Sequence, residues 1–550
     1  MIGAITHSVA NANCEPIQVQ VMDATKCFDK LWLQSCINSL YEAGVDNDYL
    51  NLLYMENRNA NIAVKINNQL STRISVKDVV MQGSVWGSLK CTTSMDTMNK
   101  TAISDKTLQY LYRGDPNIPV GVLGMIDDTL AITKCGKEAI RKNAFINSFI
   151  ETHRLTLSKE KSVVLHFGKE NKCCLPCPDL RVHKDSMKKT SSTKYLGNVL
   201  STTGGQSDNI EDRRNRGWGK VSTIIGILSE VDMGLHKLEA GLMLRQAILI
   251  SSMLCSAEAW SGITDKQLAR LEVVDSSLLR RLTGGHVKCA TESLHLETGT
   301  WKLRHHLTYL RLMYHHHILT REDNETIKKI YIKQTNNNIK GDWFQLLVKD
   351  FEFIKTEMNE KEISDMSKDM YKKVVKDLIN KAVFEFLMNQ KQTHKKIDEV
   401  EYSRLETQPY LTTNTLKTAE KELLFNMRSK CHKSKINFKR LYKNNLQCSL
   451  GCVQPEDQRH TFTTCLKIPN NYPNATYEDI FGTLANQEQA IQIFNKIDLS
   501  RKHTQKNHIL PGRERRLPGL MHTQFIVWCS KCLIAIAFVV DLIKKKGYIT

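Results

Sequence analysis

The stretch GMIDDTLAIT, residues 124–133, places two aspartates side by side between two short apolar runs. Each run is typical of a short strand, so the pair is expected at the tip of a tight hairpin. Two interpretations are open from these residues. Aspartate is common in turns because its side chain bonds to the backbone, and the pair is then an ordinary solvated turn. Alternatively, bound cations offset the repulsion between the carboxylates of Asp127 and Asp128, and the pair is a metal site.

The composition is that of a globular protein with a basic surface. The 550 residues are 41% hydrophobic and 25% charged, and 77 Lys+Arg against 58 Asp+Glu give a net charge of +19. The length allows several domains. The basic excess indicates a polyanionic partner such as nucleic acid, or else a solubilising surface. The N-terminus lacks the basic start and long apolar run of a secretory signal, so we expect an intracellular chain with reduced cysteines, apart from any that bind metal.

An apolar stretch near the C-terminus, residues 525–543, is about long enough to span a bilayer. Lys531 and Asp541 interrupt it, and a charged side chain at membrane depth is costly. A buried helix is therefore favoured over a membrane anchor, and we do not expect a membrane among the partners.

The hydrophobic periodicity changes near residue 200. Before it, alternating or fully apolar runs predict strands, and helical patterns stand between them. Strands are predicted at 16–23, 120–126, 129–133 and 162–168, a hairpin with an Asn-Asn turn at 62–79, and helices at 33–45 and 137–155. From about residue 206 to residue 428 most segments have helical periodicity. The chain therefore predicts an α+β unit followed by a mainly helical region.

Three adjacent histidines, residues 315–317, fall in one of the predicted helices, at 303–319. Neighbouring residues of a helix do not share a face. We therefore expect these side chains to divide between the core and the surface rather than to bind one metal ion together.

A third carboxylate stands at the end of another predicted strand. Asp23 closes the apolar run PIQVQVMD, and Phe28 follows five residues later. Between Asp23 and the aspartate pair, Gln82 and Gly83 follow one predicted strand and precede a predicted helix. Two cations about 4 Å apart, held by carboxylates at the ends of adjoining strands, can drive an in-line phosphoryl displacement. A strand-end aspartate and an aspartate pair on a neighbouring hairpin supply such a set.

The order of these motifs is similar to the palm of a reverse transcriptase. DATKCF at 23–28, QGSVWG at 82–87 and MIDD at 125–128 come in the family's order. LTLSKEKS at 155–162 resembles the segment that places a lysine beside the nucleotide phosphates, and TKYLGNVLS at 193–201 resembles the primer-gripping hairpin. The run from residue 256 to residue 321 resembles the thumb and post-thumb region of non-LTR (LINE-type) retrotransposon polyproteins.

The resemblance implies a fold and a division of the chain. The expected fold is an α+β palm of the polymerase right hand with its fingers largely missing, then a mainly α-helical thumb and C-terminal region with a small zinc element. The expected divisions are a palm with partial fingers at 1–200, a helical thumb and post-thumb at 201–320, a helical connector at 321–430, a basic segment with a zinc element at 431–470, and a tail at 471–550.

The resemblance also implies catalytic roles. Asp23, Asp127 and Asp128 would bind two Mg²⁺ ions, or Mn²⁺ in their place. Lys161 would approach the nucleotide phosphates or act as a general acid. From the residues alone, Lys161 is also interpretable as an exposed surface lysine, which is the usual state of Lys.

Three further residues would contact the substrates in such an enzyme. Phe28 would lie under the sugar and exclude a 2′-hydroxyl, and Gln82 and Gly83 would contact the template and the incoming nucleotide. The alternatives from the residues alone are a core aromatic for Phe28 and a turn for Gln82 and Gly83.

Two features depart from the family pattern. Met125 stands where the family usually has Tyr or Phe two places before the aspartate pair. Methionine packs adaptably, so it is able to take that place, with altered primer or template contacts. In addition, only 22 residues precede Asp23, where the family places its fingers. The chain is therefore expected to be the C-terminal part of a longer reading frame.

A metal-binding spacing follows the helical region. Cys448, Cys452, His460 and Cys465 form the pattern C-x3-C-x7-H-x4-C. Zinc takes four such ligands in a tetrahedron, and four protein ligands leave no open position, so the expected role is structural. The spacing resembles the C-terminal CCHC motif of LINE polyproteins. The alternative is a set of unrelated reduced thiols.

A basic segment, residues 428–443, precedes the zinc spacing and contains no acidic residue. Phe438 and Tyr442 lie among its basic residues, a combination that suits phosphate contacts and base stacking. The predicted nucleic-acid contacts are Arg428, Lys430, Lys433, Lys435, Lys439, Arg440 and Lys443. The alternative is a solvated basic helix face.

Together these features predict an RNA-directed DNA polymerase of a non-LTR retrotransposon. It would extend a DNA 3′-hydroxyl on an RNA template with deoxynucleoside triphosphates, in the nucleus, with an upstream polyprotein portion or its equivalent as a further partner. The rival hypothesis is a catalytically inactive, truncated remnant that binds nucleic acid. The three aspartates favour the enzyme, and the short segment before Asp23 favours the remnant.

Overall fold

The computed structural model describes most of the chain up to residue 465 and a few residues beyond it. The described residues are 2–11, 16–58, 60–76, 80, 86–126, 128–134, 136–168, 178–230, 237–336, 339–393, 400–431, 446–457, 460–465, 487–488, 490–492 and 495. The predictions made for Asp127, for Gln82 and Gly83, for residues 432–445 and for the apolar stretch 525–543 lie outside them.

A five-stranded sheet forms the centre of the N-terminal unit. Its order is β13-β10-β1-β9-β8, and its bounds are β1 Ile17–Asp23, β8 Val122–Met125, β9 Asp128–Lys134, β10 Val163–Phe167 and β13 Lys188–Lys189. β1 pairs antiparallel with β9 on one side and with β10 on the other, whereas β10 and β13 are parallel, so the sheet is mixed. The strands predicted around residues 16–23, 120–126, 129–133 and 162–168 are confirmed.

The two faces of β1 belong to two different cores. Ile17, Val19 and Val21 are buried on one face, whereas Met22 is buried in the core on the other face. Because side chains alternate along a strand, a strand that is covered on both sides is expected to be apolar throughout. Gln18 and Gln20 depart from this expectation on the Met22 face, where both are buried. Burial of both faces places β1 in the middle layer of the unit.

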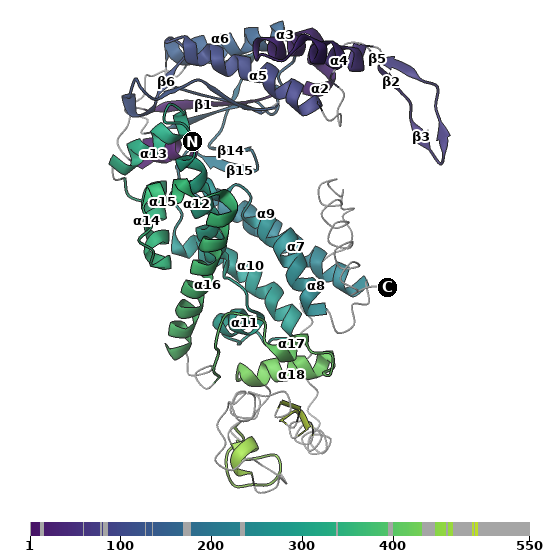
Figure 1. Cartoon of the computed structure of the whole chain (residues 1–550), viewed down its shortest axis with the longest axis vertical. Helices are drawn as coiled ribbons and strands as arrows, with labels where there is room; N and C mark the ends of the chain where they lie inside the picture. Colours follow the sequence, from purple (N-terminus) through teal and green to yellow (C-terminus); the bar gives the residue numbers. More distant parts are fainter. Residues whose placement is uncertain are drawn as a thin grey trace.

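Helices cover the Met22 face of the sheet (Figure 1). They are α2 Cys27–Lys30, α3 Leu33–Glu42, α5 Gly87–Ser104 and α6 Lys137–Thr152, with α4 Asn47–Arg58 packed against α3. A small polar network lies between the sheet and α6. Asn143 donates to Gln20 Oε1 at 3.1 Å, and Gln20 donates to the Ala139 carbonyl at 3.3 Å. These bonds satisfy polar groups that are otherwise costly to bury.

The opposite face of the sheet is closed partly by a helix from the second half of the chain. α1 Ile2–Asn11 contributes Ile5, and α13 Thr326–Asn336 contributes Ile330 to the same core. Two ion pairs accompany this contact: Lys333 Nζ lies 2.8 Å from Asp115 Oδ2, and Arg113 Nη2 lies 3.2 Å from Asp342 Oδ2. The helical region is thus docked on the sheet (Figure 1).

A two-stranded arm, residues 60–76, extends from the N-terminal unit beyond α4 (Figure 1). Its strands are β2 Ala60–Ile62, β3 Lys65–Ile66, β4 Gln69–Leu70 and β5 Ile74–Val76. Asn67 and Asn68 both have positive φ, at 48° and 67°, as the commonest two-residue hairpin turn requires. The predicted Asn-Asn hairpin is therefore confirmed.

Short strands complete the part of the chain before residue 202. They are β6 Tyr110–Leu111 and β7 Pro119–Val120, joined through η1 Tyr112–Gly114, then β11 Arg181–Val182 with β12 Asp185–Ser186, and β14 Ser192–Tyr195 with β15 Asn198–Ser201. Beyond β15 the named elements of the described chain are helical. The predicted order, a mixed α+β unit followed by a mainly helical region, is confirmed.

Two apolar cores organise the helices. The first joins α7 Ser207–Glu230, α8 Lys237–Leu244, η4 Arg245–Ile250, α9 Ser251–Met253, η5 Ala257–Ala259, α10 Asp265–Thr283, α17 Pro409–Thr412 and α18 Thr418–Arg428. The second joins α11 Thr291–Thr298, α12 Leu303–Leu319, α14 Trp343–Ile354, α15 Glu360–Asp365 and α16 Lys368–Thr393. A buried, two-pronged ion pair crosses the first core, where Arg245 donates to both Asp275 carboxylate oxygens at 2.6 and 2.7 Å.

The three adjacent histidines of α12 divide as expected. His315 and His316 are buried, with His315 Nε2 3.0 Å from Tyr331 Oη and His316 Nε2 2.9 Å from the Met366 carbonyl, whereas His317 is exposed. Their side chains therefore meet different neighbours. Within the described residues, no helix combines the length and the apolar character needed to cross a membrane.

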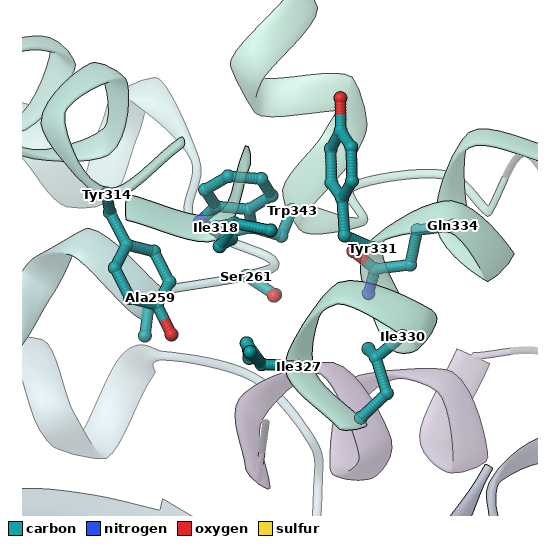
Figure 2. Close-up of a pocket in the computed structure, with 9 residues that line it drawn as sticks. All are labelled: Ala259, Ser261, Tyr314, Ile318, Ile327, Ile330, Tyr331, Gln334 and Trp343. Atoms are coloured by element: carbon teal, nitrogen blue, oxygen red, sulfur yellow. The ribbon is translucent and has the colours of Figure 1, made fainter. Parts of the chain in front are cut away.

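A cavity of about 20 Å³ lies where η5, α12, α13 and α14 meet (Figure 2). Ala259, Ser261, Tyr314, Ile318, Ile327, Ile330, Tyr331, Gln334 and Trp343 line it. A space of this size holds about one water molecule. It is therefore a packing defect of the helical junction and not a nucleotide site.

One buried lysine predicts a pH dependence of stability. Lys142 Nζ donates to the carbonyls of Gly121 and Ile132 at 3.1 and 2.9 Å, and burial lowers its pKa to about 7. The unfolded chain keeps this proton up to about pH 10.5, so the folded chain gains stability as pH rises from about 7. Relative to Lys142→Met, the unfolding free energy of the native chain should rise with a slope approaching about 1.4 kcal/mol per pH unit.

Urea unfolding at pH 7, 8 and 9 measures this difference. Lys137→Met, on the exposed side of the same helix, is the matched control and should shift stability equally at each pH. A pH-independent difference between the native chain and Lys142→Met would show that Lys142 keeps its proton in the fold.

Candidate active site and metal centre

The register of β1 and β9 brings two of the predicted aspartates together. Asp23, the last residue of β1, is the direct partner of Asp128, the first residue of β9. Directly opposed residues of an antiparallel pair point to the same face, with Cβ atoms about 4.5–5.5 Å apart. Both side chains are partly exposed, so two carboxylates stand together at one solvent-accessible edge of the sheet.

The hairpin that carries Asp128 is backbone-strained at its tip. Met125 pairs with Asp128, and Ile126 has a φ of 60°, a conformation that β-branched residues rarely adopt. Such a conformation costs about 1–3 kcal/mol and persists where the surroundings impose it, often at functional sites. Ile126 packs against the core on the Met22 face, which provides part of the compensation.

Lys161 reaches the same edge. Its Nζ lies 3.1 Å from Asp23 Oδ2. The loop that carries it is tied to the end of β1 because Thr25 N–H donates to the Thr156 carbonyl and Ser158 N–H donates to the Asp23 carbonyl, each at 2.8 Å. The lysine side chain remains 69% exposed, so only its tip is engaged, by an ion pair that is weak in water.

Tyr195 is a residue that the sequence reasoning did not single out. It lies at the end of β14 and is buried. It belongs to the same core as Leu130 and Ile132, whose side chains lie on the same face of β9 as that of Asp128. Burial raises the pKa of Tyr195, and the negative charge of Asp128 raises it further. The hairpin β14–β15 thus approaches the carboxylate pair. The sequence signal that could have identified Tyr195 is its place at the end of a short strand after the lysine loop, in the segment TKYLGNVLS.

The hairpin is held in place by a fully buried arginine of α7. Arg213 donates to Asn198 Oδ1 at 2.8 Å and to the carbonyls of Ser252 and Cys255 at 3.0 and 2.8 Å. Trp260 Nε1 donates to the same Asn198 oxygen at 3.0 Å. Because these bonds join β15 to α7, to α9 and to the turn after α9, the helical region fixes the hairpin beside the carboxylates.

Phe28 lies in α2, one turn after the Asp23 strand end. Its side chain is half-buried and packs against the core on the Met22 face. This position agrees with a core contact, and part of the residue remains exposed. Its predicted role under a sugar remains a prediction.

Residues 5–200 match the family model described as reverse transcriptase (RNA-dependent DNA polymerase). Residues 5–200 form a reverse transcriptase domain. Asp23, Asp128 and Lys161 all lie within the matched residues, and the family prediction made from the motif order is confirmed. The domain is that of an RNA-directed DNA polymerase, a family that uses divalent metal ions. The carboxylate pair of this reverse transcriptase domain supplies the hard oxygen ligands that Mg²⁺ prefers.

Among solved structures, the chain is similar to telomerase from Candida albicans in complex with a TWJ fragment of telomeric RNA. The identity is 11% and the TM-score is 0.25, and the match covers 49% of this chain and 48% of that one. The chain thus matches about half the length of that telomerase chain. None of the curated proteins matches this chain.

A second centre lies far from the reverse transcriptase domain in sequence. The sulfur and nitrogen atoms of Cys448, Cys452, His460 and Cys465 all lie within 4.8 Å of one another. Cys465 Sγ is 3.9 Å from Cys448 Sγ and 3.5 Å from Cys452 Sγ. The structure therefore brings together the four residues predicted from their spacing, and three sulfurs with one imidazole fit Zn²⁺.

Neighbouring residues form hydrogen bonds with the donor groups of this cluster. His460 Nδ1 lies 2.5 Å from Gln454 Oε1 and 3.1 Å from Thr464 Oγ1, and among the described residues no partner meets the buried His460 Nε2. An N–H at Nδ1 leaves a lone pair on Nε2 for a metal. Burial lowers the pKa of His460, which favours this neutral form. Leu450 N–H also points at Cys448 Sγ, at 3.4 Å, as suits a thiolate.

The prediction that Arg428 contacts nucleic acid is wrong. Its side chain is 3% exposed, and its Nε donates to the buried Glu297 Oε1 at 2.8 Å. The rings of Tyr402 and Tyr410 lie 5.8 and 5.5 Å from the guanidinium carbon. Arg428 therefore ends α18 inside the core. The sequence pattern grouped it with a basic run because the buried partner is 131 residues away in the chain.

Two variants test this reassignment of Arg428. Arg428→Ala leaves Glu297 as an unpaired buried charge, which typically costs about 3–5 kcal/mol, and should destabilise the fold in urea unfolding. Arg404→Ala, at an exposed arginine with a surface partner, is the matched control and should stay within about 0.5 kcal/mol. If Arg428→Ala instead kept its stability and reduced the salt dependence of nucleic-acid binding, the original assignment would be right.

Zinc analysis tests the second centre. The chain produced in zinc-containing medium should carry one zinc ion by native mass spectrometry, and Cys465→Ser should lose it because three ligands bind far more weakly than four. Cys255→Ser, at an exposed cysteine outside the cluster, should keep the metal. Equal metal content in all three proteins would rule out the cluster as the binding site.

Proposed function

We propose that this chain is the RNA-directed DNA polymerase of a non-LTR retrotransposon and that it extends a DNA 3′-hydroxyl on an RNA template. The observation that carries the proposal is the pairing of Asp23 with Asp128 at one sheet edge, with Lys161 Nζ 3.1 Å from Asp23, inside a reverse transcriptase domain. The retrotransposon context is supported by the helical region and the Cys₃His cluster that follow the domain in the expected order.

The carboxylates and the lysine of the site have distinct roles in the proposed reaction. Asp23 and Asp128, together with Asp127, hold two Mg²⁺ ions. These ions, when bound, acidify the primer 3′-hydroxyl and neutralise the triphosphate. Lys161 leaves the Asp23 carboxylate and pairs with a phosphate of the nucleotide. Its exposed side chain permits this movement, and the phosphate is a more highly charged anionic partner than the carboxylate.

Other residues position the substrates in this proposal. Phe28 lies under the sugar, and Gln82 and Gly83 contact the template and the nucleotide. The β14–β15 hairpin, which Arg213 fixes, supports the primer end beside Tyr195. The remaining basic residues after α18 contact nucleic-acid phosphates. They are Lys430, Lys433, Lys435, Lys439, Arg440 and Lys443.

The chain has five parts in this proposal and binds nucleic acid and nucleotides. Residues 1–200 are the palm with partial fingers, 201–320 the thumb and post-thumb, 321–430 a helical connector, 431–470 a basic segment with a structural zinc element, and 471–550 a tail. The partners are an RNA template, a DNA primer or target and deoxynucleoside triphosphates, and the location is nuclear. The net charge of +19 supports a nucleic-acid partner.

Primer extension tests the proposal directly. The full chain should extend a DNA primer on an RNA template with Mg²⁺ and deoxynucleotides. Asp23→Asn and Asp128→Asn should each lower the rate at least about 100-fold, because metal-ion stabilisation worth several kcal/mol depends on these carboxylates. Asp96→Asn, at a partly exposed aspartate of α5, is the matched control and should extend normally.

Two outcomes would contradict the enzyme proposal. Extension that persists in both active-site variants would place the chemistry elsewhere. No extension by the native chain, together with tight primer–template binding that weakens steeply with salt, would favour the inactive nucleic-acid-binding remnant.

A further inference from the structure

Two thiols touch behind the catalytic edge. Cys27 Sγ and Cys91 Sγ are 3.3 Å apart, and the two residues are 2% and 0% exposed. Cys27 begins α2, four residues after Asp23 and directly before Phe28. Cys91 lies in α5, the helix that follows the predicted template contacts. The pair therefore joins the two segments that border the proposed nucleotide site, and the polymerase chemistry uses neither thiol.

The geometry is close to that of a disulfide. A disulfide bond is about 2.05 Å long, so the two sulfurs need to approach by only about 1.2 Å. The segment able to make this movement is α2, a helix of four residues preceded by Lys26 in the left-handed conformation at φ 52°. In contrast, α5 has 18 residues and packs along α3 and β8.

A third buried thiol, Cys36 in α3, lies near this pair. Burial raises the pKa of Cys36 to about 12, although a hydrogen bond with Ser94 partly opposes the rise. The direct sulfur–sulfur contact with Cys27 favours Cys91 over Cys36 as its partner.

We propose that Cys27 and Cys91 form a reversible disulfide when the chain meets a hydroperoxide. The Cys27 sulfur attacks one peroxide oxygen, the O–O bond breaks, and a sulfenic acid and one water are formed when the oxidant is hydrogen peroxide. The Cys91 sulfur then attacks the sulfenic sulfur, and the hydroxyl leaves with the Cys91 proton as a second water. The two thiols lose two electrons and two protons in total, which the peroxide takes up, and a dithiol reverses the reaction.

The expected consequence is a loss of polymerisation. The bond pulls α2 toward α5, and α2 carries Phe28 and follows the strand that ends in Asp23. Displacing a substrate-positioning group by about 1 Å can cost about 100-fold in rate. This consequence rests on the proposed function, whereas formation of the bond does not. Disulfides of intracellular proteins are typically transient and serve redox sensing, in agreement with a reversible bond.

The test treats the full chain with hydrogen peroxide and then maps disulfides by mass spectrometry of non-reduced peptides. The native chain should yield a Cys27–Cys91 linked peptide that dithiothreitol removes. Its primer extension should fall at least about tenfold on oxidation and return on reduction. Cys91→Ser should resist this loss, and Cys255→Ser, at an exposed cysteine, should behave as the native chain does.

The outcomes separate this inference from the proposed function. A reduced native chain that extends no primer contradicts the polymerase proposal, while the linked peptide alone still establishes the disulfide. Absence of the Cys27–Cys91 peptide, or a Cys27–Cys36 peptide in its place, overturns the inferred site. An oxidative loss of extension that persists in Cys91→Ser assigns the effect to other thiols, including those of the Cys₃His cluster, and overturns the inferred control.

Discussion

The antiparallel register between β1 and β9 is the constraint on which the site depends. It pairs Asp23 with Asp128 at the sheet edge and, in the same ladder, Val19 with Ile132 deep in the core. Sliding either strand by one residue would exchange the two faces, moving Val19 and Val21 to the face that now carries Gln18 and Gln20 and separating Asp23 from Asp128. The apolar residues of β1, on both faces, therefore hold the two carboxylates opposite each other. Burial of these apolar side chains stabilises the register, which keeps the like-charged carboxylates of Asp23 and Asp128 together at the strand ends.

The position of the helical region adds a second constraint. Arg213 is completely buried, and three of its hydrogen bonds run to the β14–β15 hairpin, to α9 and to the turn after α9. An arginine in such a place is costly unless its donors are satisfied. The hairpin that approaches Asp128 is therefore part of the interface with α7. The docking of α13 on the same face of the sheet as the hairpin, through Ile330, and the ion pair of Lys333 with Asp115 make the two halves of the chain one packed body.

The sequence predicted the strands, the Asn-Asn hairpin and the reverse transcriptase family because these depend on local patterns. Alternation, turn chemistry and the order of short motifs can all be recognised without knowing any distant contact. It also predicted the four residues of the Cys₃His cluster, because short ligand spacings largely determine which side chains are able to meet. Arg428 shows where this approach fails. Its local neighbours are basic, and its buried partner Glu297 comes from another helix.

The sequence by itself determined which residues are candidates for chemistry: the strand-end aspartates, the lysine loop and the cysteines with their histidine. The tertiary structure decided which of them meet and what surrounds them. It pairs Lys161 with Asp23 and brings Tyr195 close enough to Asp128 for the carboxylate charge to raise the tyrosine pKa. It also places Cys27 in contact with Cys91, which is 64 residues away in the chain. The physical reason is that residue type and spacing act over a few residues, whereas burial, pairing and desolvation depend on contacts that only the packed chain creates.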